Sequence, residues 1–574
     1  MTKKNMPVIL LCAMLIASLL LAACSGGNNA SSQPPATQGT TGAAQDATKP
    51  AQTDSASTEP PAQTAAAAGA ATAGEGLPLT DKKTTFSMAA SKRDFSPEYD
   101  GMPLLTDLES RTNVHVEWNL IPQSQYAEKK NIILASNELP DAFFGQTALT
   151  MNDLVMYGST GSFIDLKDLV KKHAPNITKL MGENDLFGKV AFAPDGNMYG
   201  LPRAKQLGYN DAPDQLFIYK PWLEKLGLGI PATLDEFHNV LSEFKNKDPN
   251  GNGLQDEIPF TFRYKTHYQG MYSLFGSFGL PDNYLNDILS HVAIKGGKML
   301  YVPVQPEYKE AIAYFHTYFA EGLIDKEAFT MDSNAYVARG ATDDVIVGAH
   351  VTWNDFDVAG AVRKDDYTAV PPMKGPRGEQ SWNSYMHDNN GIVGNGFSIT
   401  NVCKDPELLI RWADLFYDKE FSIEVQAGPI GYNIKKAAGG KFEYLPIPDG
   451  MTADEFNFHY SPVDAPSAVF YDVYKSGLLP MSDTMATKNR YVELYRPYMT
   501  VSTYPGGVTF TPEENTRLAA LATDIGNFVN DRQAQWLLNG GIDAEWDSYL
   551  ASLKTMGLDE MLNLYETALN RFNN

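Results

Sequence analysis

From residue 79 onward, short apolar runs alternate with amphipathic segments. The short apolar runs predict strands at residues 84–89, 114–119 and 345–351, with a further apolar segment at 142–144. Apolar positions spaced three or four residues apart predict helices at residues 126–135, 221–226, 234–244, 308–320 and 407–416, and almost throughout 511–572. This alternation is typical of α/β folds.

The length of this region predicts two lobes. Residues 79–574 form a stretch of about 496 residues, which is too long for one hydrophobic core and suits two lobes of roughly 200–250 residues. We expect a sheet flanked by helices in each lobe, lobes that are interleaved in sequence, and a helical C-terminal region. Thr233 is the expected N-cap of the helix at 234–244, with Glu236 three residues later as in a capping box.

The first 23 residues have the pattern of a secretory signal peptide. Lys3 and Lys4 precede an almost wholly apolar stretch at 6–22, and small residues lead to Cys24. The Leu-Ala-Ala-Cys sequence that ends at Cys24 resembles the lipobox of bacterial lipoproteins. This resemblance implies lipidation of Cys24 and anchoring on the outer face of the cell membrane, since two acyl chains suffice for stable attachment. The alternative is an ordinary cleaved signal followed by a chance cysteine.

Residues 24–78 are predicted to form a disordered tether. They are mostly Ala, Ser, Thr, Gln, Gly and Pro without any aromatic residue, and Leu77 is their one large aliphatic side chain. Such a composition buries too little apolar surface to offset the entropy of ordering. As a flexible coil the tether would span roughly 40 Å.

Charge and cysteine content exclude several classes of protein. The formal net charge is −23, and all but one unit lies beyond residue 78, which disfavours nucleic acid as a partner. Of three cysteines, Cys12 lies in the signal and Cys24 at the lipidation motif, so Cys403 alone remains and no disulfide framework is possible. We interpret Cys403 as a small buried side chain.

Residues 248–259 (DPNGNGLQDEIP) predict a calcium site. Asp248, Asn250 and Asn252 stand at positions one, three and five of an EF-hand loop, and Gly253 stands at position six. Leu254 would supply a backbone carbonyl at position seven, and Asp256 occupies position nine. Oxygen ligation by one loop predicts a structural Ca²⁺ without redox chemistry. The alternative is an acidic, Gly-rich surface turn.

Six segments carry a resemblance to the family 1 extracellular solute-binding proteins of ABC importers, and within them to the calcium-binding subgroup that includes alginate-binding proteins. They follow the family order and span the predicted domain: LASNELPD at 134–141, DGNMYGLP at 195–202, IYKPWLEKLGL at 218–228, ATLDEF at 232–237, the loop at 248–259, and MGLDEM at 556–561. The resemblance implies a two-lobed periplasmic-binding-protein-like fold that closes on a sugar or oligosaccharide.

The resemblance also bears on the calcium loop. Position twelve of an EF-hand is a bidentate Glu, whereas this chain has Pro259. The related binding proteins imply that Glu257, two residues earlier, completes the coordination shell.

The sequence gives little support for an enzyme. It contains no His-Glu-x-x-His, Gly-x-Ser-x-Gly or P-loop motif. Asp355 and Asp357 beside Trp353 are candidate glycosidase carboxylates, but solvated loop acids are the simpler interpretation.

Candidate ligand contacts combine aromatic rings, which stack on sugar faces, with polar side chains that pair hydroxyl groups. Trp353 follows a predicted strand, and Trp382 with Asn383 lies in a polar, strand-poor region that is predicted to be a loop. Arg203 offers a guanidinium fork for vicinal hydroxyls or a carboxylate. Trp118 and Tyr272 are further candidates. The helical tryptophans are expected in the core: Trp222, Trp412, Trp536 and Trp546.

The predicted function is capture of a carbohydrate by lobe closure and delivery to the permease of an ABC importer, by a protein expected to be a monomer. Two alternatives stay open at this stage: a solute-sensing lipoprotein that feeds a signalling partner, and a polysaccharide-processing enzyme.

Overall fold

The computed structural model describes residues 76–574, except 94, 209–210, 213, 265–268, 282–290, 355–357, 361–362, 364, 384–390, 452, 478–482 and 501–503. The predicted signal peptide, Cys24 and nearly all of the tether lie outside these residues. Within them, no helix is long and apolar enough to cross a membrane.

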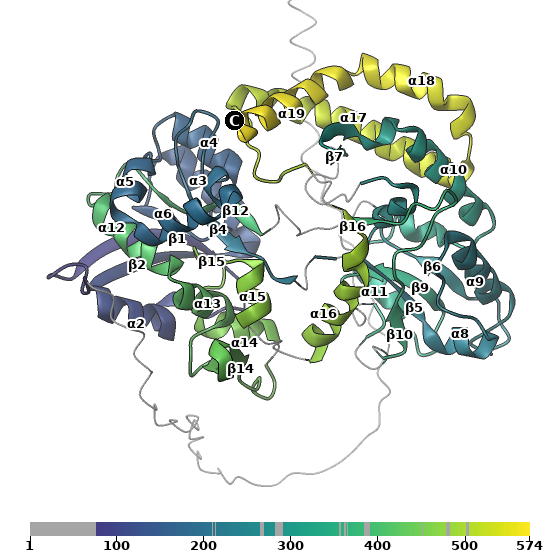
Figure 1. The fold of residues 1–574 in the computed structure, drawn as a ribbon, viewed down its shortest axis with the longest axis horizontal. Helices are drawn as coiled ribbons and strands as arrows, with labels where there is room; N and C mark the ends of the chain where they lie inside the picture. Colours follow the sequence, from purple (N-terminus) through teal and green to yellow (C-terminus); the bar gives the residue numbers. More distant parts are fainter. Residues whose placement is uncertain are drawn as a thin grey trace, which may run out of the picture. The chain divides into compact units, whose positions relative to one another are not determined.

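A six-stranded sheet forms the first lobe (Figure 1). Its strands, in spatial order, are β15 (Ala468–Val469), β4 (Leu201–Lys205), β12 (Ile392–Ile399), β3 (Ala142–Phe144), β1 (Thr84–Lys92) and β2 (Val114–Pro122). β1 is parallel to both β2 and β3, while β12 is antiparallel to β3 and β4. The carboxyl ends of β1 to β4 therefore share one edge of the sheet.

Helices pack their apolar faces on this sheet. Trp412 is 2% exposed and lies 6.0 Å from Phe144 and 4.8 Å from Phe416, measured between ring centroids. The helices of the first lobe are α2 (Pro103–Thr112), α3 (Gln123–Ser136), α4 (Met151–Ser159), α5 (Lys167–His173), α6 (Pro175–Glu183), α7 (Asp185–Lys189), α12 (Pro406–Asp414), α13 (Lys419–Ala427), α14 (Ala453–Tyr460) and α15 (Tyr471–Gly477).

A four-stranded sheet forms the second lobe, in the order β10 (Tyr367–Ala369), β5 (Gln215–Tyr219), β9 (Val347–Thr352) and β6 (Ile258–Thr261). All six residues of β9 are buried, as expected for a central strand covered on both faces. The helices of this lobe are α8 (Lys220–Leu226), α9 (Leu234–Asn246), α10 (Pro306–Ala320), α11 (Ser333–Gly340) and α16 (Asp483–Tyr495). The Thr233 hydroxyl accepts from the Glu236 backbone N–H, so the predicted N-cap of α9 is confirmed.

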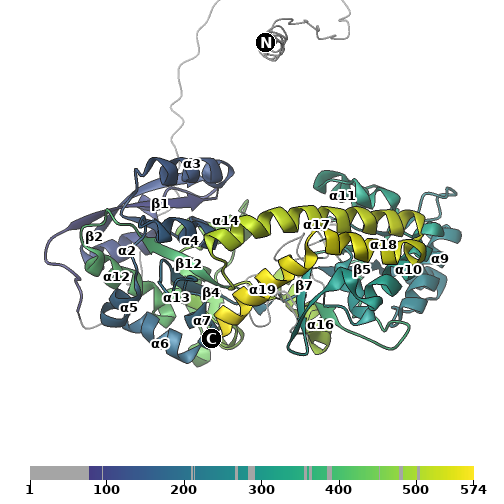
Figure 2. The same cartoon turned by 90° about the horizontal axis from the view of Figure 1, so that it is seen from above.

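Three C-terminal helices complete the fold: α17 (Pro512–Asn539), α18 (Ile542–Thr555) and α19 (Leu558–Asn573). A capping box between Thr511 and Glu514 starts α17, and glycines with positive φ separate the three helices. α17 packs against α10 and also contacts α4 of the first lobe (Figure 2). Trp536 is 1% exposed in the core that these helices share with the second sheet.

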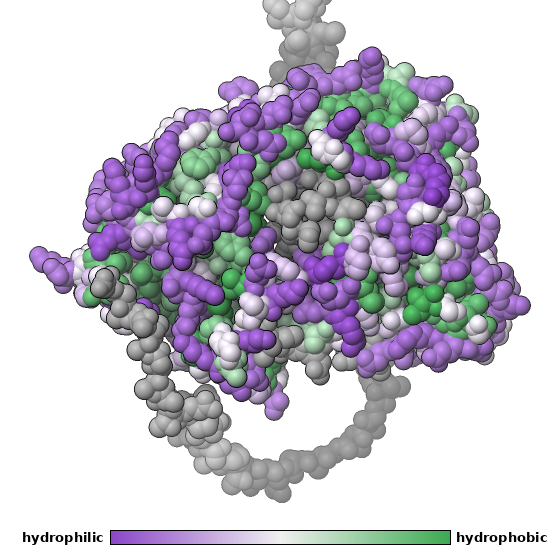
Figure 3. Space-filling model, in the orientation of Figure 1, coloured by the Kyte–Doolittle hydropathy of each residue, from purple (hydrophilic) through white to green (hydrophobic). Residues whose placement is uncertain are grey.

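The elements predicted from hydrophobic pattern are confirmed, as is the α/β fold with a helical C-terminal region. Trp222, Trp412 and Trp536 are buried, and Trp546 packs against the core. Three two-stranded ribbons were not predicted: β7 (Val292–Lys295) with β8 (Lys298–Tyr301), β13 (Ile434–Lys436) with β14 (Phe442–Tyr444), and β11 (Trp382–Asn383) with β16 (Met499–Thr500). The face in Figure 3 is mainly hydrophilic, in keeping with the acidic composition.

Candidate functional site

The chain passes from the first lobe to the second in the segment between β4 and β5, residues 206–214, which we call the crossing. It joins the edges of the two sheets at which most strands end, the carboxyl edges. β4 ends at Lys205 and β5 begins at Gln215, which pairs with Thr352 at the end of β9. Because β6 is parallel to β9, the end of β6 lies at this same edge. Ligands of α/β binding proteins lie in the crevice beyond the carboxyl ends of the strands. The candidate site is therefore built from the residues that follow these strand ends.

On the second lobe, Trp353 directly follows β9 and is held by Lys488 of α16. The Lys488 ammonium donates to the carbonyl oxygen of Ala212, at 2.9 Å, and to that of Trp353. It also lies 4.7 Å from the centre of the Trp353 ring, within the range of a cation–π interaction. Lys488 is only 2% exposed, and a lysine is rarely so buried without partners. The ammonium thus links the interlobe crossing, which contains Ala212, to Trp353.

Asp214 adds a second buried charged group at this edge. Its side chain accepts a hydrogen bond from the Ser273 hydroxyl. Burial raises the pKa of the Asp214 carboxyl to about 7, while the Ser273 hydrogen bond and the nearby Lys488 charge act to lower it. The second-lobe edge therefore carries a carboxyl group that titrates near neutral pH.

On the first lobe, Arg203 is 1% exposed within β4. Its Nε donates to the Ala465 carbonyl at 3.0 Å, Nη1 to Gln146 Oε1 at 2.7 Å, and Nη2 to the Val463 carbonyl at 2.8 Å. These bonds fasten two segments beyond the sheet to β4. The structure gives Arg203 a bracing role, and its predicted contact with a ligand stays a prediction.

The other predicted aromatic contacts lie in packed surroundings. Trp118 lies between Tyr99 and Phe144, with ring centroids at 5.1 and 5.0 Å. Tyr272 is 2% exposed and donates to Gln533 Oε1 at 2.9 Å.

Trp382 is also 2% exposed and packs on Tyr495 at 4.8 Å, not in a loop as predicted but in β11. Asn383 is the other residue of β11, and its side chain lies outside the described part of the chain. Of these four aromatic candidates, only Trp353 directly follows a strand that ends beside the crossing. Contact with a ligand remains a prediction for all four.

Sequence analysis missed Lys488, although a signal for it exists. Lys488, Val492 and Tyr495 are all buried and stand at helical spacing on one face of α16. A lysine within an apolar stripe predicts a buried ammonium.

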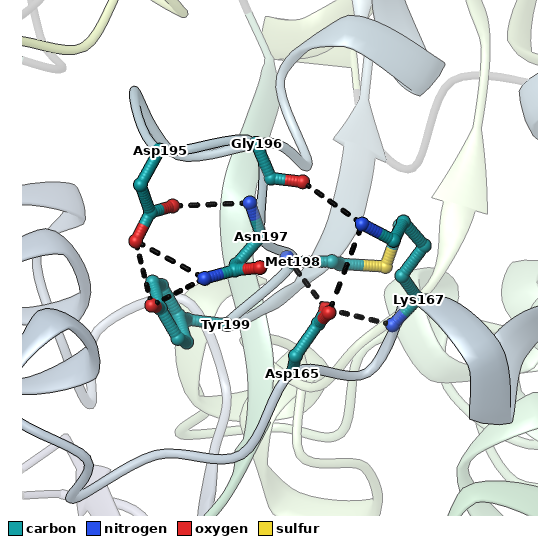
Figure 4. Close-up of polar contacts among 7 residues, drawn as sticks. All are labelled: Asp165, Lys167, Asp195, Gly196, Asn197, Met198 and Tyr199. Atoms are coloured by element: carbon teal, nitrogen blue, oxygen red, sulfur yellow. Dashed lines mark hydrogen bonds and ion pairs between the residues drawn. The ribbon is translucent and has the colours of Figure 1, made fainter.

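The DGNMYGLP segment forms the turn that leads into β4 (Figure 4). Asp195 accepts hydrogen bonds from the Asn197 backbone at 3.0 Å and from the Tyr199 hydroxyl at 2.7 Å. The Asp165 carboxylate accepts from the Met198 backbone at 3.0 Å. These contacts fix the turn itself, so this motif positions β4 and Arg203.

The predicted calcium loop folds around its own oxygen atoms. Asp248 accepts from the backbone of Gly251 at 2.8 Å and of Gly253 at 3.0 Å, and Asn252 Oδ1 accepts from the Leu254 backbone at 2.8 Å. Asp248, Gly251 and Gly253 have positive φ, which tightens the turn. No three His, Cys, Asp or Glu side chains in the described part of the chain are grouped as a metal site, so amide and carbonyl oxygens would have to contribute.

Glu257 provides the test of fit for a cation. Both of its carboxylate oxygens are buried and have no hydrogen-bond partner. Burial raises the pKa of this carboxyl and the neighbouring Asp248 and Asp256 raise it further, while the nearby backbone N–H groups of Glu257 and Asn250 act to lower it. A buried carboxylate is costly unless strong hydrogen bonds or a cation compensate its charge. The loop therefore fits a hard cation with oxygen ligands.

The fold and the paired sheet edges define a two-lobed binding protein of the periplasmic-binding type. The profile of the family described as bacterial extracellular solute-binding protein matches residues 102–421, more than half of the chain. The chain therefore belongs to the bacterial extracellular solute-binding proteins, and this membership agrees with the prediction of a binding protein rather than an enzyme.

Two bacterial relatives illustrate the similarity. The fructooligosaccharide ABC transporter substrate-binding protein FusA of Streptococcus pneumoniae serotype 4 is 32% identical over 508 residues, covering 86% of this chain and 92% of FusA. The lipoprotein LipO of Bacillus subtilis is 27% identical over 372 residues, covering 62% of this chain and 69% of LipO.

Solved structures show the same fold. FusA of S. pneumoniae in complex with kestose aligns with a TM-score of 0.71 at 30% identity, covering 85% of this chain and 99% of FusA. An EF-hand mutant of FusA in complex with fructo-nystose aligns with the same values. A solute-binding protein from Bifidobacterium longum infantis, associated with an HMO-binding ABC transporter, gives a TM-score of 0.73 at 25% identity and covers 86% and 99% of the two chains.

Proposed function

We propose that this protein captures a neutral oligosaccharide outside the cell and delivers it to the permease of an ABC importer. The observation that carries the proposal is the 32% identity to a fructooligosaccharide-binding transporter protein over 86% of this chain. The position of Trp353 after β9, beside the crossing between sheets, supports it. A ligand that contacts the carboxyl edges of both sheets makes all of its contacts only when the lobes are closed. It would therefore bind the closed arrangement more tightly and shift the equilibrium toward it.

Charge favours a neutral ligand over an anionic one. The chain carries a formal charge of −23, and the guanidinium of Arg203 is engaged by three protein acceptors. Short fructooligosaccharides such as kestose and nystose are therefore the first ligands to test. A uronate oligomer is the matched anionic comparison.

We also propose that residues 248–257 hold a structural Ca²⁺. Asp248, Asn250, Asn252, Asp256 and Glu257 would supply side-chain oxygens, and Leu254 its carbonyl. The buried, unpartnered carboxylate of Glu257 supports this assignment, as does the EF-hand named for FusA. The ion would neutralise the loop carboxylates and fix the turn between α9 and β6, while the chain's own residues bind the sugar.

Attachment to the membrane is proposed through a lipid on Cys24. The Leu-Ala-Ala-Cys sequence and the similarity to the lipoprotein LipO support it. In cell fractionation, we expect the wild-type protein in the membrane fraction and the Cys24→Ala variant in the medium or in an unprocessed form.

Thermal unfolding in calcium with kestose, nystose, an oligogalacturonide and glucose tests the ligand. A ligand at about 100 times its dissociation constant should add about 2.7 kcal/mol and raise the midpoint by a few degrees. We expect a shift with a neutral fructooligosaccharide, which chromatography should then recover intact. The absence of a shift with every sugar would refute a fructooligosaccharide ligand, and recovery of cleaved sugar would refute a binding protein.

A further inference from the structure

An exposed aromatic pair stands at the carboxyl edge of the first sheet. Phe95 lies three residues beyond the end of β1 and is 50% exposed. Its ring meets that of Phe458, on α14, edge to face at 5.8 Å. Phe458 is half-buried. Single exposed apolar residues are common on protein surfaces, but Phe95 differs in being half of an aromatic pair.

Polar groups flank this pair. The Arg93 guanidinium lies 5.3 Å from the centre of the Phe458 ring. Its Nη1 donates to Gln123 Oε1 at 2.8 Å, and its Nε lies 3.9 Å from Asp464 Oδ2. The partly exposed guanidinium of Arg93 and the largely buried carboxylate of Asp464 therefore border an apolar surface, and a sugar ring requires this combination of polar and apolar groups.

The base beneath this surface is rigid. The Asp464 carbonyl accepts from the Gln146 backbone at 3.0 Å, and Gln146 in turn accepts from the buried Arg203. Gly145 has φ 93°, and a Cβ there would lie 3.0 Å from the Asp464 carbonyl oxygen. Only glycine permits this approach, so the end of β3 holds the Asp464 segment in place.

The edge that carries these residues is the one from which the interlobe crossing leaves. β1 and β3 are parallel, so Arg93 and Gln146, which follow them, lie at one edge. β4 ends at the same edge and leads into the crossing. Phe95 with its partner Phe458 therefore lies at the carboxyl edge of the first sheet, and Trp353 lies at that of the second; the crossing joins these two edges.

We infer that Phe95, Phe458, Arg93 and Asp464 form a sugar-ring subsite on the first lobe. The apolar face of one ring would lie on the phenylalanine pair, while Arg93 donates to its hydroxyl oxygens and Asp464 accepts from its hydroxyl groups. A second ring of the same ligand would reach Trp353. The ligand is then an oligosaccharide, because a single ring reaches one lobe alone. This inference rests on the proposed function.

Calorimetric titration of the purified protein with nystose, kestose and fructose tests the subsite. We expect Phe95→Ala, Phe458→Ala and Arg93→Met each to weaken nystose binding by about tenfold, a factor typical of a lost specific contact. The matched control is Ile230→Ala, which removes an equally exposed apolar side chain (48%) on the second lobe and should leave binding unchanged. Phe95 is exposed enough that its truncation should leave the unfolding midpoint near that of the wild type.

The outcomes separate the two proposals. If the wild type binds nystose and Phe95→Ala, Phe458→Ala and Arg93→Met all bind as tightly, the subsite is refuted and the proposed function stands. If the wild type binds none of the three sugars, a fructooligosaccharide ligand is refuted, and with it the subsite proposed for that ligand. Wild-type affinity for fructose equal to that for nystose would also refute the subsite, since one ring would then suffice.

Discussion

The ammonium of Lys488 lies 4.7 Å from the centre of the Trp353 ring and donates a hydrogen bond to the carbonyl of the same residue. It also donates to Ala212, in the segment that joins the two sheets. One buried charge thus fixes both the backbone and the ring of Trp353 relative to the crossing. This relationship makes Lys488 a positioning residue for the proposed ligand contact.

Replacing Lys488 with Met should reduce both stability and ligand affinity. The substitution keeps most of the side-chain volume but leaves two carbonyl oxygens without their donor, at about 1–3 kcal/mol for each buried acceptor. Equilibrium denaturation should show a loss of roughly 2 kcal/mol or more. The fluorescence emission of Trp353 should also change. It is measured as the difference between the spectra with and without Trp353→Phe, once in the wild type and once in the Lys488→Met protein.

Lys475→Met is the matched control. Lys475 also lies over an aromatic ring, that of Tyr471 at 5.8 Å, but it is exposed. We expect nearly wild-type behaviour, because exposed cation–π pairs contribute little. Equal effects of the two substitutions would contradict the positioning role.

Calcium should stabilise the protein through Glu257. With calcium present, Glu257→Gln should lower the unfolding midpoint, because the substitution removes the negative charge of a carboxylate that coordinates the ion. In chelator, the same substitution should be neutral or stabilising, because it removes a buried carboxylate that has no hydrogen-bond partner. Calorimetry in both conditions measures this reversal of sign.

Glu566→Gln, on the exposed surface of α19, serves as the control for lost charge and should behave like the wild type in both conditions. A Glu257→Gln protein that is equally destabilised with and without calcium would argue for a purely structural carboxylate.

Local pattern predicted the elements well and the site poorly, for a physical reason. The strand β9 and the capping of α9 have local signals, an apolar run in the first case and Thr233 three residues before Glu236 in the second, and a sequence pattern records both. The burial of Trp382 depends on Tyr495, and the approach of Arg93 to Asp464 depends on segments that are far apart in the chain. Trp382 therefore had the composition of a loop residue, although tertiary contacts bury it.

Arg203 also has a local signal that differs from its tertiary contacts. In the sequence, an arginine after a Gly-Leu-Pro turn suggests a guanidinium that binds a ligand. In the structure, its three hydrogen-bond acceptors come from segments that are distant in the chain. The residue that sequence analysis assigned to the ligand is the one that the structure shows bracing the edge of the first sheet.

Arg203→Lys should therefore destabilise the protein. A lysine ammonium cannot reproduce the planar fork that reaches Gln146, Val463 and Ala465 at once. The loss should be about 2–4 kcal/mol in urea denaturation, as expected when buried hydrogen bonds to a charged group are broken. Arg532→Lys, on the surface of α17, should change stability by less than about 0.5 kcal/mol. An Arg203→Lys protein with wild-type stability but weakened ligand binding would instead support the direct ligand contact predicted from sequence.

The titration of Asp214 should make stability depend on pH between about 4 and 7. Burial raises the pKa of this carboxyl from 3.8 to about 7 in the folded protein, so the folded state binds its proton more tightly than the unfolded chain. Its contribution is therefore fully favourable below about pH 4, declines as pH rises toward 7, and is constant above that. Asp414, whose pKa burial raises to about 6, acts in the same direction, whereas buried His350, whose pKa falls to about 3, acts in the opposite direction.

Comparison with Asp214→Asn cancels the contributions of Asp414 and His350 and keeps an acceptor for Ser273. We expect the free energy of unfolding of the wild type, relative to that variant, to fall from pH 4.5 to pH 7.5 in urea denaturation. A difference that stays constant across this range would show that Asp214 titrates normally in the folded protein.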